Sequence, residues 1–193
     1  MGATETTTAR AGGETTFRLT GGRAEPTALL RDMYGRILIL RHDPITASLP
    51  RIRLMLLKVA DAHGFEHPEL HRVLAAFGRF ADDLERHLVE EDHVLFPLVG
   101  RVDAGEVVAD ELAGEIESLD AAHARIGAAL EEISSLTDGF TPPADACDTY
   151  RMLMDELRIL AACVRQTVAE ETDVLFPGAV ARAAGRVVDR FGA

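Results

Sequence analysis

A segment that occurs twice in the chain has the residue types and spacing of a metal-binding helix. The first copy is Glu85–Pro97 (ERHLVEEDHVLFP) and the second is Arg165–Pro177 (RQTVAEETDVLFP), with six of thirteen positions identical. In the first copy His87 precedes Glu91 by four residues, so about one helical turn separates them and both lie on one face. An imidazole and a carboxylate on adjacent turns can bind one metal ion. The repeat therefore predicts a metal site inside a helical bundle.

The second copy lacks one of these two side chains. Glu171 corresponds to Glu91, but Thr167 stands where the first copy has His87. A neutral threonine hydroxyl is a poor iron ligand compared with an imidazole or a carboxylate. We therefore expect a metal site with one protein ligand missing.

The repeat extends to the helix before each segment. His42 precedes His87 by 45 residues, and His123 precedes Thr167 by 44 residues. Each half of the chain thus supplies one helix with a lone histidine and a second helix that ends in Glu-x-x-x-Leu-Phe-Pro. The sequence predicts two copies of one helix pair.

Two such helix pairs, packed together, would direct five candidate ligands to one stretch of the core: His42, His87, Glu91, His123 and Glu171. Taken singly, each histidine is more often a packed or surface residue, and a Glu-Glu pair is often solvated. Burial of unpaired carboxylates costs several kcal/mol each, and a bound cation removes that cost. The matched spacing in both halves favours a metal site, and two bridging carboxylates with flanking imidazoles form the ligand set of a di-iron centre.

The composition is that of one globular domain without a membrane span. The 193 residues are 47% hydrophobic, which is enough for one core, and no apolar run reaches the ~18 residues of a transmembrane helix. The N-terminal region has no apolar stretch that would indicate a secretion signal. The two cysteines, Cys147 and Cys163, are too few for a disulfide framework, so we expect a cytoplasmic protein. The net charge of −12 argues against nucleic acid or an anionic membrane as the main partner.

The apolar spacing predicts an all-α, four-helix up-down bundle over residues 26–193, preceded by a flexible arm at residues 1–25. No segment alternates for long enough to make a sheet. A proline should end the second helix, because it cannot continue the hydrogen-bond ladder. The expected helices start at Pro26 with a kink or short break at Asp43-Pro44, then run over Pro68–Pro97, Glu106–Leu136 and Ala144–Phe176.

At this level the chain resembles the hemerythrin-like (HHE) cation-binding family, and more narrowly the proteins that repair iron–sulfur clusters after nitrosative and oxidative stress. The LT-x-G-x-TPP turn and the AC-x-T-aromatic start of the last helix are distinctive. The likeness covers nearly everything from residue 27 to 180. The stretches that carry it are Ser48-Leu49-Pro50, Glu85–Pro97, and Asp120–Tyr150 with Val174–Pro177.

The resemblance implies a hemerythrin-like bundle around a non-haem di-iron centre with an oxo bridge. By the resemblance, His42 and His87 would bind one iron, His123 would bind the other, and Glu91 and Glu171 would bridge both. Family members often carry a small N-terminal domain with paired cysteines, and we expect this chain to lack it.

The family pattern has a histidine where this chain has Thr167, so the second iron is expected to be more open and more weakly held. Water or a small anion is the simplest occupant of the vacant position. Cys163 lies one turn before Thr167 and could offer a thiolate, although a small apolar core residue is the more ordinary role for it. A tyrosinate from Tyr34 or Tyr150 is a further alternative.

Three functions are compatible with such a site. The resemblance implies iron–sulfur cluster repair by iron donation to other proteins, or redox chemistry on O2, nitric oxide or peroxide. Turnover, and hence enzymatic activity, is an open question. The alternatives are a sensor or carrier that binds O2 or nitric oxide without turnover, and a bundle that has lost its metal and binds a partner.

Three further histidines, spaced by four residues, could be mistaken for ligands: His63, His67 and His71. Gly64 and Pro68 interrupt their segment, which favours a solvated loop. His93 is rotated about 240° from His87 on the helix, so it should point away from the site. Cys147 is expected to pack at the start of the fourth helix.

Overall fold

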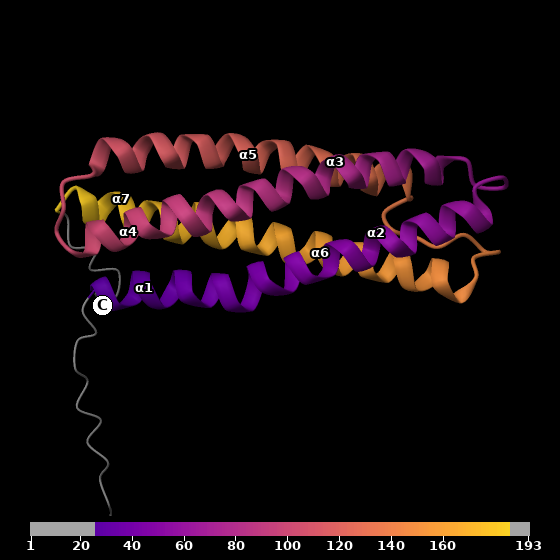
Figure 1. Ribbon diagram of the computed structural model, residues 1–193, viewed down its shortest axis with the longest axis horizontal. Helices are drawn as coiled ribbons and strands as arrows, with labels where there is room; N and C mark the ends of the chain where they lie inside the picture. Colours follow the sequence, from indigo (N-terminus) through magenta and orange to yellow (C-terminus); the bar gives the residue numbers. More distant parts are fainter. Residues whose placement is uncertain (1–25, 186–193) are drawn as a thin grey trace, which may run out of the picture.

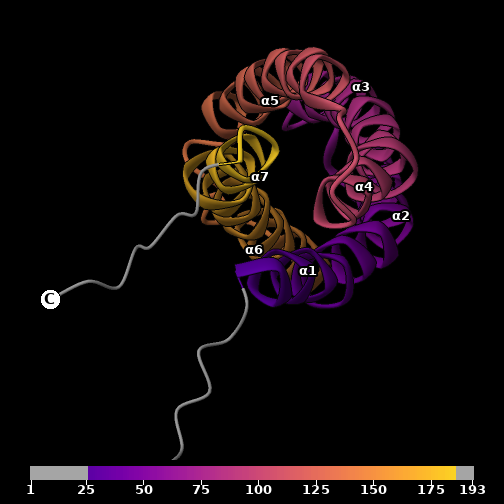
Figure 2. The same ribbon diagram turned by 90° about the vertical axis from the view of Figure 1, so that its left-hand side faces the viewer.

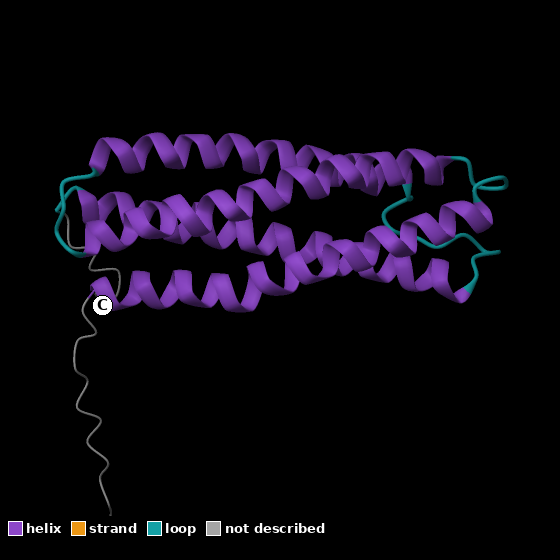
Figure 3. Cartoon of the chain, viewed as in Figure 1, coloured by secondary structure: helices purple, strands orange, loops and turns teal. Residues whose placement is uncertain are grey.

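The computed structural model describes residues 26–185, which form four long helices joined by short loops (Figure 1). The predicted all-α bundle is confirmed, and this part of the chain contains no strand (Figure 3). The arm predicted at residues 1–25 lies outside the described residues. The helices comprise α1 (Pro26–Ile37), η1 (Leu38–His42) and α2 (Asp43–His63); α3 (Glu69–Glu90), η2 (Glu91–Leu95) and α4 (Phe96–Asp103); α5 (Ala109–Leu136); and α6 (Asp148–Glu170), η3 (Glu171–Leu175) and α7 (Phe176–Ala183).

The four helices surround a common core, as the end view shows (Figure 2). The short loops make successive helices antiparallel. α3 packs along α5 on one side and α2 on the other, and α2 in turn packs along α6. Within residues 26–185 no helix combines the length and the hydrophobicity that a membrane crossing requires.

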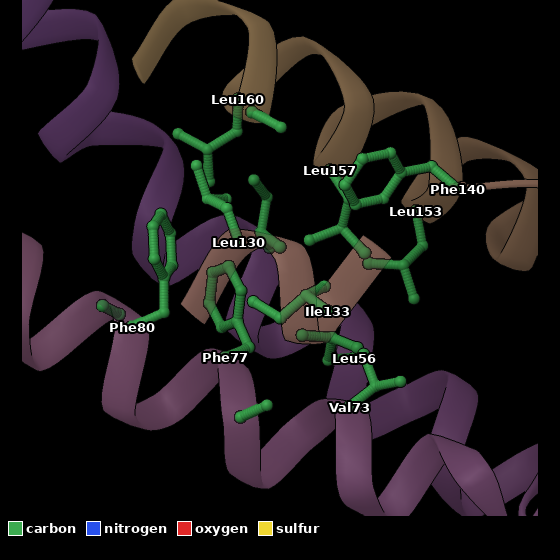
Figure 4. Close-up of a cluster of buried hydrophobic side chains, with 14 of the residues drawn as sticks. Leu56, Val73, Phe77, Phe80, Leu130, Ile133, Phe140, Leu153, Leu157 and Leu160 are labelled. Carbon is green, nitrogen blue, oxygen red and sulfur yellow. The ribbon is translucent and has the colours of Figure 1, made fainter. Parts of the chain in front are cut away.

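The core consists of two hydrophobic clusters with a polar layer between them. The larger cluster joins α2, α3, α6 and the second half of α5 (Figure 4), and includes Leu56, Val73, Phe77, Phe80, Ile133 and Leu153. The smaller cluster joins α1, α4, α7 and the first half of α5, and includes Leu95, Val99, Leu112 and Leu175. Burial of one such side chain stabilises the fold by roughly 1.5–3 kcal/mol. Two apolar clusters therefore hold the intervening polar side chains in place.

Three of the four helices continue through a proline, contrary to the expectation that prolines would end or break them. The second helix does not end at Pro97 but runs to Asp103, and the fourth does not end at Phe176 but runs to Ala183. In the first helix a π-helical turn, η1, rather than a break precedes Asp43-Pro44. The predicted ends of the second and fourth helices were wrong.

A π-helical turn explains how the helices accommodate these prolines. η1, η2 and η3 end two residues before Pro44, Pro97 and Pro177, respectively. In an α-helix a proline ring clashes with the carbonyl four residues back and lacks the N–H for the ladder. The wider turn, in which the Phe96 N–H bonds to the carbonyl of Glu91, places the proline in the first turn of a new α-helical segment, where neither restriction applies.

The last two helices start later than predicted. The third begins at Ala109 rather than Glu106, and the fourth begins at Asp148 rather than Ala144. Three successive residues with positive φ, Asp138 (48°), Gly139 (68°) and Phe140 (63°), end the third helix at Leu136 as predicted, because left-handed backbone prevents helical continuation. The fourth helix starts late because Cys147, directly before it, has an extended backbone (ψ 170°).

Candidate metal centre

The five ligands predicted from the repeat come together in the polar layer between the two clusters. All have exposed fractions of 8% or less. Three of them lie in π-helical turns, one lies in α3 and one lies in α5. They are His42 at the end of η1, His87 in α3, Glu91 at the start of η2, His123 in α5 and Glu171 at the start of η3. That these side chains bind metal remains a prediction.

The two carboxylates lie at the centre of the group, with imidazole nitrogens around them. Glu171 directs its two oxygens to different partners: Oε1 lies 3.4 Å from His42 Nε2, and Oε2 lies 3.2 Å from His123 Nε2. Glu91 Oε2 lies 3.4 Å from the Nε2 atoms of both His42 and His87. A carboxylate whose oxygens face different imidazoles has the geometry of a bridge between two metal positions.

His87 lies near histidines from both neighbouring helices. Its Nε2 lies 3.0 Å from His123 Nε2, and the ligand atoms of His87, Glu91, His123 and Glu171 lie within 4.8 Å of one another. His87 also faces the same oxygen of Glu91 as His42 does. The reason is the packing of the bundle, in which α3 lies along both α2 and α5.

The donor atoms fit a bound cation. Glu91 is fully buried, and neither of its oxygens accepts a hydrogen bond from the residues that the structure describes; Glu171 Oε2 is in the same situation. The nearby imidazole nitrogens approach these oxygens without hydrogen-bond alignment, as expected for lone pairs that face a common point. Buried charges without partners are costly. Two carboxylates and three imidazoles suit a divalent transition metal such as iron.

Burial also shapes the ionisation of the group. It lowers the pKa of His87 to about 3, with a further contribution from the nearby His123, so His87 is neutral and free to bind a metal. Burial and the adjacent Glu171 raise the pKa of Glu91 well above its usual value. Burial acts against ionisation of Glu171 as well, but its contacts with His123 and His42 outweigh that effect and lower its pKa. Without a bound cation, burial therefore opposes a negative charge on both carboxylates at once.

The structure places none of the candidate replacement ligands at the position where Thr167 stands in for a histidine. Thr167 is buried, and its hydroxyl donates to the carbonyl of Cys163 (2.9 Å) within its own helix. The Cys163 thiol is partly exposed and interacts with Arg41, and it is not among the converging ligand atoms. Tyr34 stacks on Phe96, with ring centroids 5.2 Å apart. Water or a small anion stays the predicted occupant.

Tyr150 and the three histidines set aside from the site lie together at the other end of the larger cluster. The Tyr150 ring packs against His63 and His67, so it is remote from the predicted ligands. His63 ends α2 and His71 lies in α3, so the expectation of one solvated loop was too simple. Cys147, expected to pack at the start of the fourth helix, is exposed there, with Sγ 3.1 Å from His63 Nε2.

His93 points away from the group, as predicted. It is exposed, and its Nδ1 lies 3.0 Å from the carbonyl of Val89. Sequence reasoning missed Asp92, whose Oδ1 lies 2.9 Å from His42 Nδ1. The repeat gave no signal for this residue, because the second copy has Thr172 at the corresponding position.

A cavity between α5 and α6 leads to the group. It has a volume of about 320 Å³ and reaches the ring of His123. Its walls are mostly apolar and include Ile126, Leu130, Val164 and Val168. A small uncharged molecule fits such a lining better than an anion does.

The family model for the hemerythrin HHE cation binding domain matches residues 36–179. The chain therefore belongs to this family, as the sequence resemblance predicted. The match includes all five predicted ligands.

The chain is similar to bacterial proteins named iron-sulfur cluster repair protein YtfE. The one from Musicola paradisiaca (strain Ech703) is 33% identical over 158 residues, which are 82% of this chain and 68% of that protein. The one from Yersinia pseudotuberculosis serotype IB (strain PB1/+) is 32% identical over 140 residues, 72% of this chain and 61% of that protein. The one from Enterobacter sp. (strain 638) is 29% identical over 156 residues, 80% and 68% of the two chains. The matches thus span 61% to 68% of these relatives.

Proposed function

We propose that this protein is a non-haem di-iron protein of the nitrosative and oxidative stress response that donates iron for the repair of iron–sulfur clusters. The observation that carries the proposal is the pair of fully buried carboxylates, Glu91 and Glu171, surrounded by three imidazoles. Membership in a cation-binding family supports it, and the names of the relatives suggest the physiological task.

The five side chains would hold two irons at inequivalent positions. His42 and His87 would bind one iron, His123 would bind the other, and Glu91 and Glu171 would bridge them. Bound iron would supply one-electron redox chemistry and a coordination position for O2, nitric oxide or peroxide. The residues of the chain neutralise the charge, exclude bulk water through the two hydrophobic clusters, and leave one position free next to Thr167.

The inequivalence of the two positions supports iron donation. The position at His123 would have a single imidazole, because α6 offers Thr167 where the family pattern has a histidine. An ion with fewer protein ligands dissociates more readily, so it can be passed to an iron–sulfur protein. The partners we propose are therefore small oxidants or nitric oxide on one hand and damaged iron–sulfur proteins on the other.

The alternative function is reversible binding of O2 or nitric oxide by a sensor or carrier without turnover. The apolar cavity beside His123 is the observation that favours it. Such a cavity is large enough to admit a diatomic molecule.

A transfer assay distinguishes the two functions. The iron-loaded chain is incubated anaerobically with an iron–sulfur enzyme whose cluster has lost one iron. Donation predicts that the enzyme regains activity while the chain loses about one of its two irons, and that a His123→Ala variant restores little. If the enzyme gains nothing and the chain keeps both irons, the sensor or carrier function replaces donation.

A further inference from the structure

His42 is held from two sides by the helix that also supplies Glu91. Its Nδ1 lies 2.9 Å from Oδ1 of Asp92, the residue directly after Glu91. Its ring stacks on Phe96, with centroids 5.8 Å apart and an interplanar angle of 21°. With Nδ1 bonded to a carboxylate and the ring face covered, Nε2 is directed towards Glu91 and Glu171.

The second half of the repeat holds His123 in the same way but with a weaker partner. Phe176 stacks on the ring with centroids 5.8 Å apart and an angle of 2°. The residue directly after Glu171 is Thr172, and its Oγ1 lies 3.5 Å from His123 Nδ1. The carboxylate nearest to this nitrogen belongs to Asp120, at 4.0 Å, which is beyond hydrogen-bonding distance.

The two halves therefore differ in the group that orients the lone histidine, and not only at Thr167. A carboxylate that accepts the Nδ1–H of a ligating histidine sets its tautomer and makes Nε2 a stronger donor to the metal. A neutral hydroxyl at 3.5 Å does this poorly. His87 has no hydrogen-bond partner for Nδ1 in the described part of the chain.

We propose that Asp92 is a positioning residue that strengthens His42 as a ligand and so retains the metal bound there. This inference rests on the proposed two-metal function. A carboxylate on Nδ1 keeps the proton on that nitrogen, which leaves the lone pair of Nε2 directed at Glu91 and Glu171. No carboxylate of the described residues lies within hydrogen-bonding distance of His123 Nδ1, so the two halves of the repeat should hold their metals with different strength.

Stepwise metal titration tests this role. Metal-free wild type, Asp92→Ala and the control Thr172→Val are titrated anaerobically with Fe(II), and with Co(II), whose absorption bands report coordination. Loss of such an orienting carboxylate typically lowers metal affinity about 10–100-fold. We expect that loss for one of the two ions in Asp92→Ala, an intermediate loss in Asp92→Asn, and a change of less than about threefold in Thr172→Val. Circular dichroism of the metal-free variants confirms that each is folded.

The effect of Asp92→Ala should be confined to the ion bound at His42. Equal weakening of both ions in Asp92→Ala, or an equal effect of Thr172→Val, would overturn the inference while leaving the two-metal site intact. A wild-type chain that binds fewer than two ions would overturn the inference and the proposed function together.

Discussion

Glu171 is the residue on which the geometry of the site depends most. One of its oxygens faces His42 and the other faces His123, so the same side chain reaches both proposed iron positions. Its neighbour Glu170 has the same chemistry but pairs with Arg41 at the surface, at 2.9 Å. Adjacent glutamates thus have different environments within one helix turn.

Glu171→Gln is expected to reduce iron binding from two ions to fewer than one per chain. The amide keeps the size of the side chain but removes the charge and turns an N–H2 donor towards the imidazoles or the metal. Iron content after anaerobic loading measures the effect. The matched control Glu170→Gln should retain two irons, and equal losses in the two variants would argue against a bridging role.

Thr167→His is expected to slow the release of the more labile iron by about tenfold or more, because it adds an imidazole to the position of His123. Release into a ferrous chelator measures the rate. An unchanged rate would mean that another group already fills the vacant position.

At the scale of the helices, the π-helical turns relate the prolines to the ligands. η2 and η3 begin at Glu91 and Glu171, and η1 ends at His42. Each turn adds a residue to the helical repeat and so sets which face the ligand occupies relative to the helix beyond it. The prolines two residues further on suit this geometry, because they restart the α-helix.

Pro97→Ala is expected to weaken iron binding severalfold, because it removes the residue that disfavours a regular helix after Glu91. Pro50, inside α2 and not preceded by a π-helical turn, is the matched control. Pro50→Ala should leave iron affinity unchanged and raise the free energy of unfolding by on the order of 1–3 kcal/mol. Titration with Fe(II) and chemical denaturation give the two values, and unchanged affinity in Pro97→Ala would contradict a role of the proline in site geometry.

The loops at the far end of the bundle are joined by a pH-dependent ion pair. His67 Nε2 lies 3.1 Å from Asp145 Oδ1, and this contact, followed by that with Glu69, raises the pKa of His67 above 6.5. Because the folded-state value is raised, the pair stabilises the fold fully below the unfolded-state pKa, and the contribution disappears as pH rises through the folded-state pKa. An NMR titration should show the raised value, and Asp145→Asn should bring it back towards 6.5. An unshifted His67 in the wild type would contradict the pair.

Along a single helix, sequence spacing was sufficient to identify the ligands. His87 and Glu91 share a face by the helical period, and the repeat extended that reasoning to His42, His123 and Glu171. Spacing within a helix does not say which helices are neighbours, so it could not predict that His87 lies beside His123. The π-helical turns were missed because an internal proline is ordinarily a stop signal, and Asp92 because its contact with His42 joins two helices.

At the scale of the whole molecule, the polar layer is confined between two hydrophobic clusters. The larger one joins all four helices and holds the fold together on one side of the predicted ligands, and the smaller one closes the layer on the other. The molecule is thus able to keep its bundle while the metal content changes, which a protein that releases iron requires.

The measurement that tests the central claim most directly is the iron content of the anaerobically purified chain, together with its absorption spectrum after oxidation. Two irons per chain and the charge-transfer bands of an oxo-bridged di-iron centre are predicted. Less than one iron per chain, with no increase when Fe(II) is added, would contradict the account.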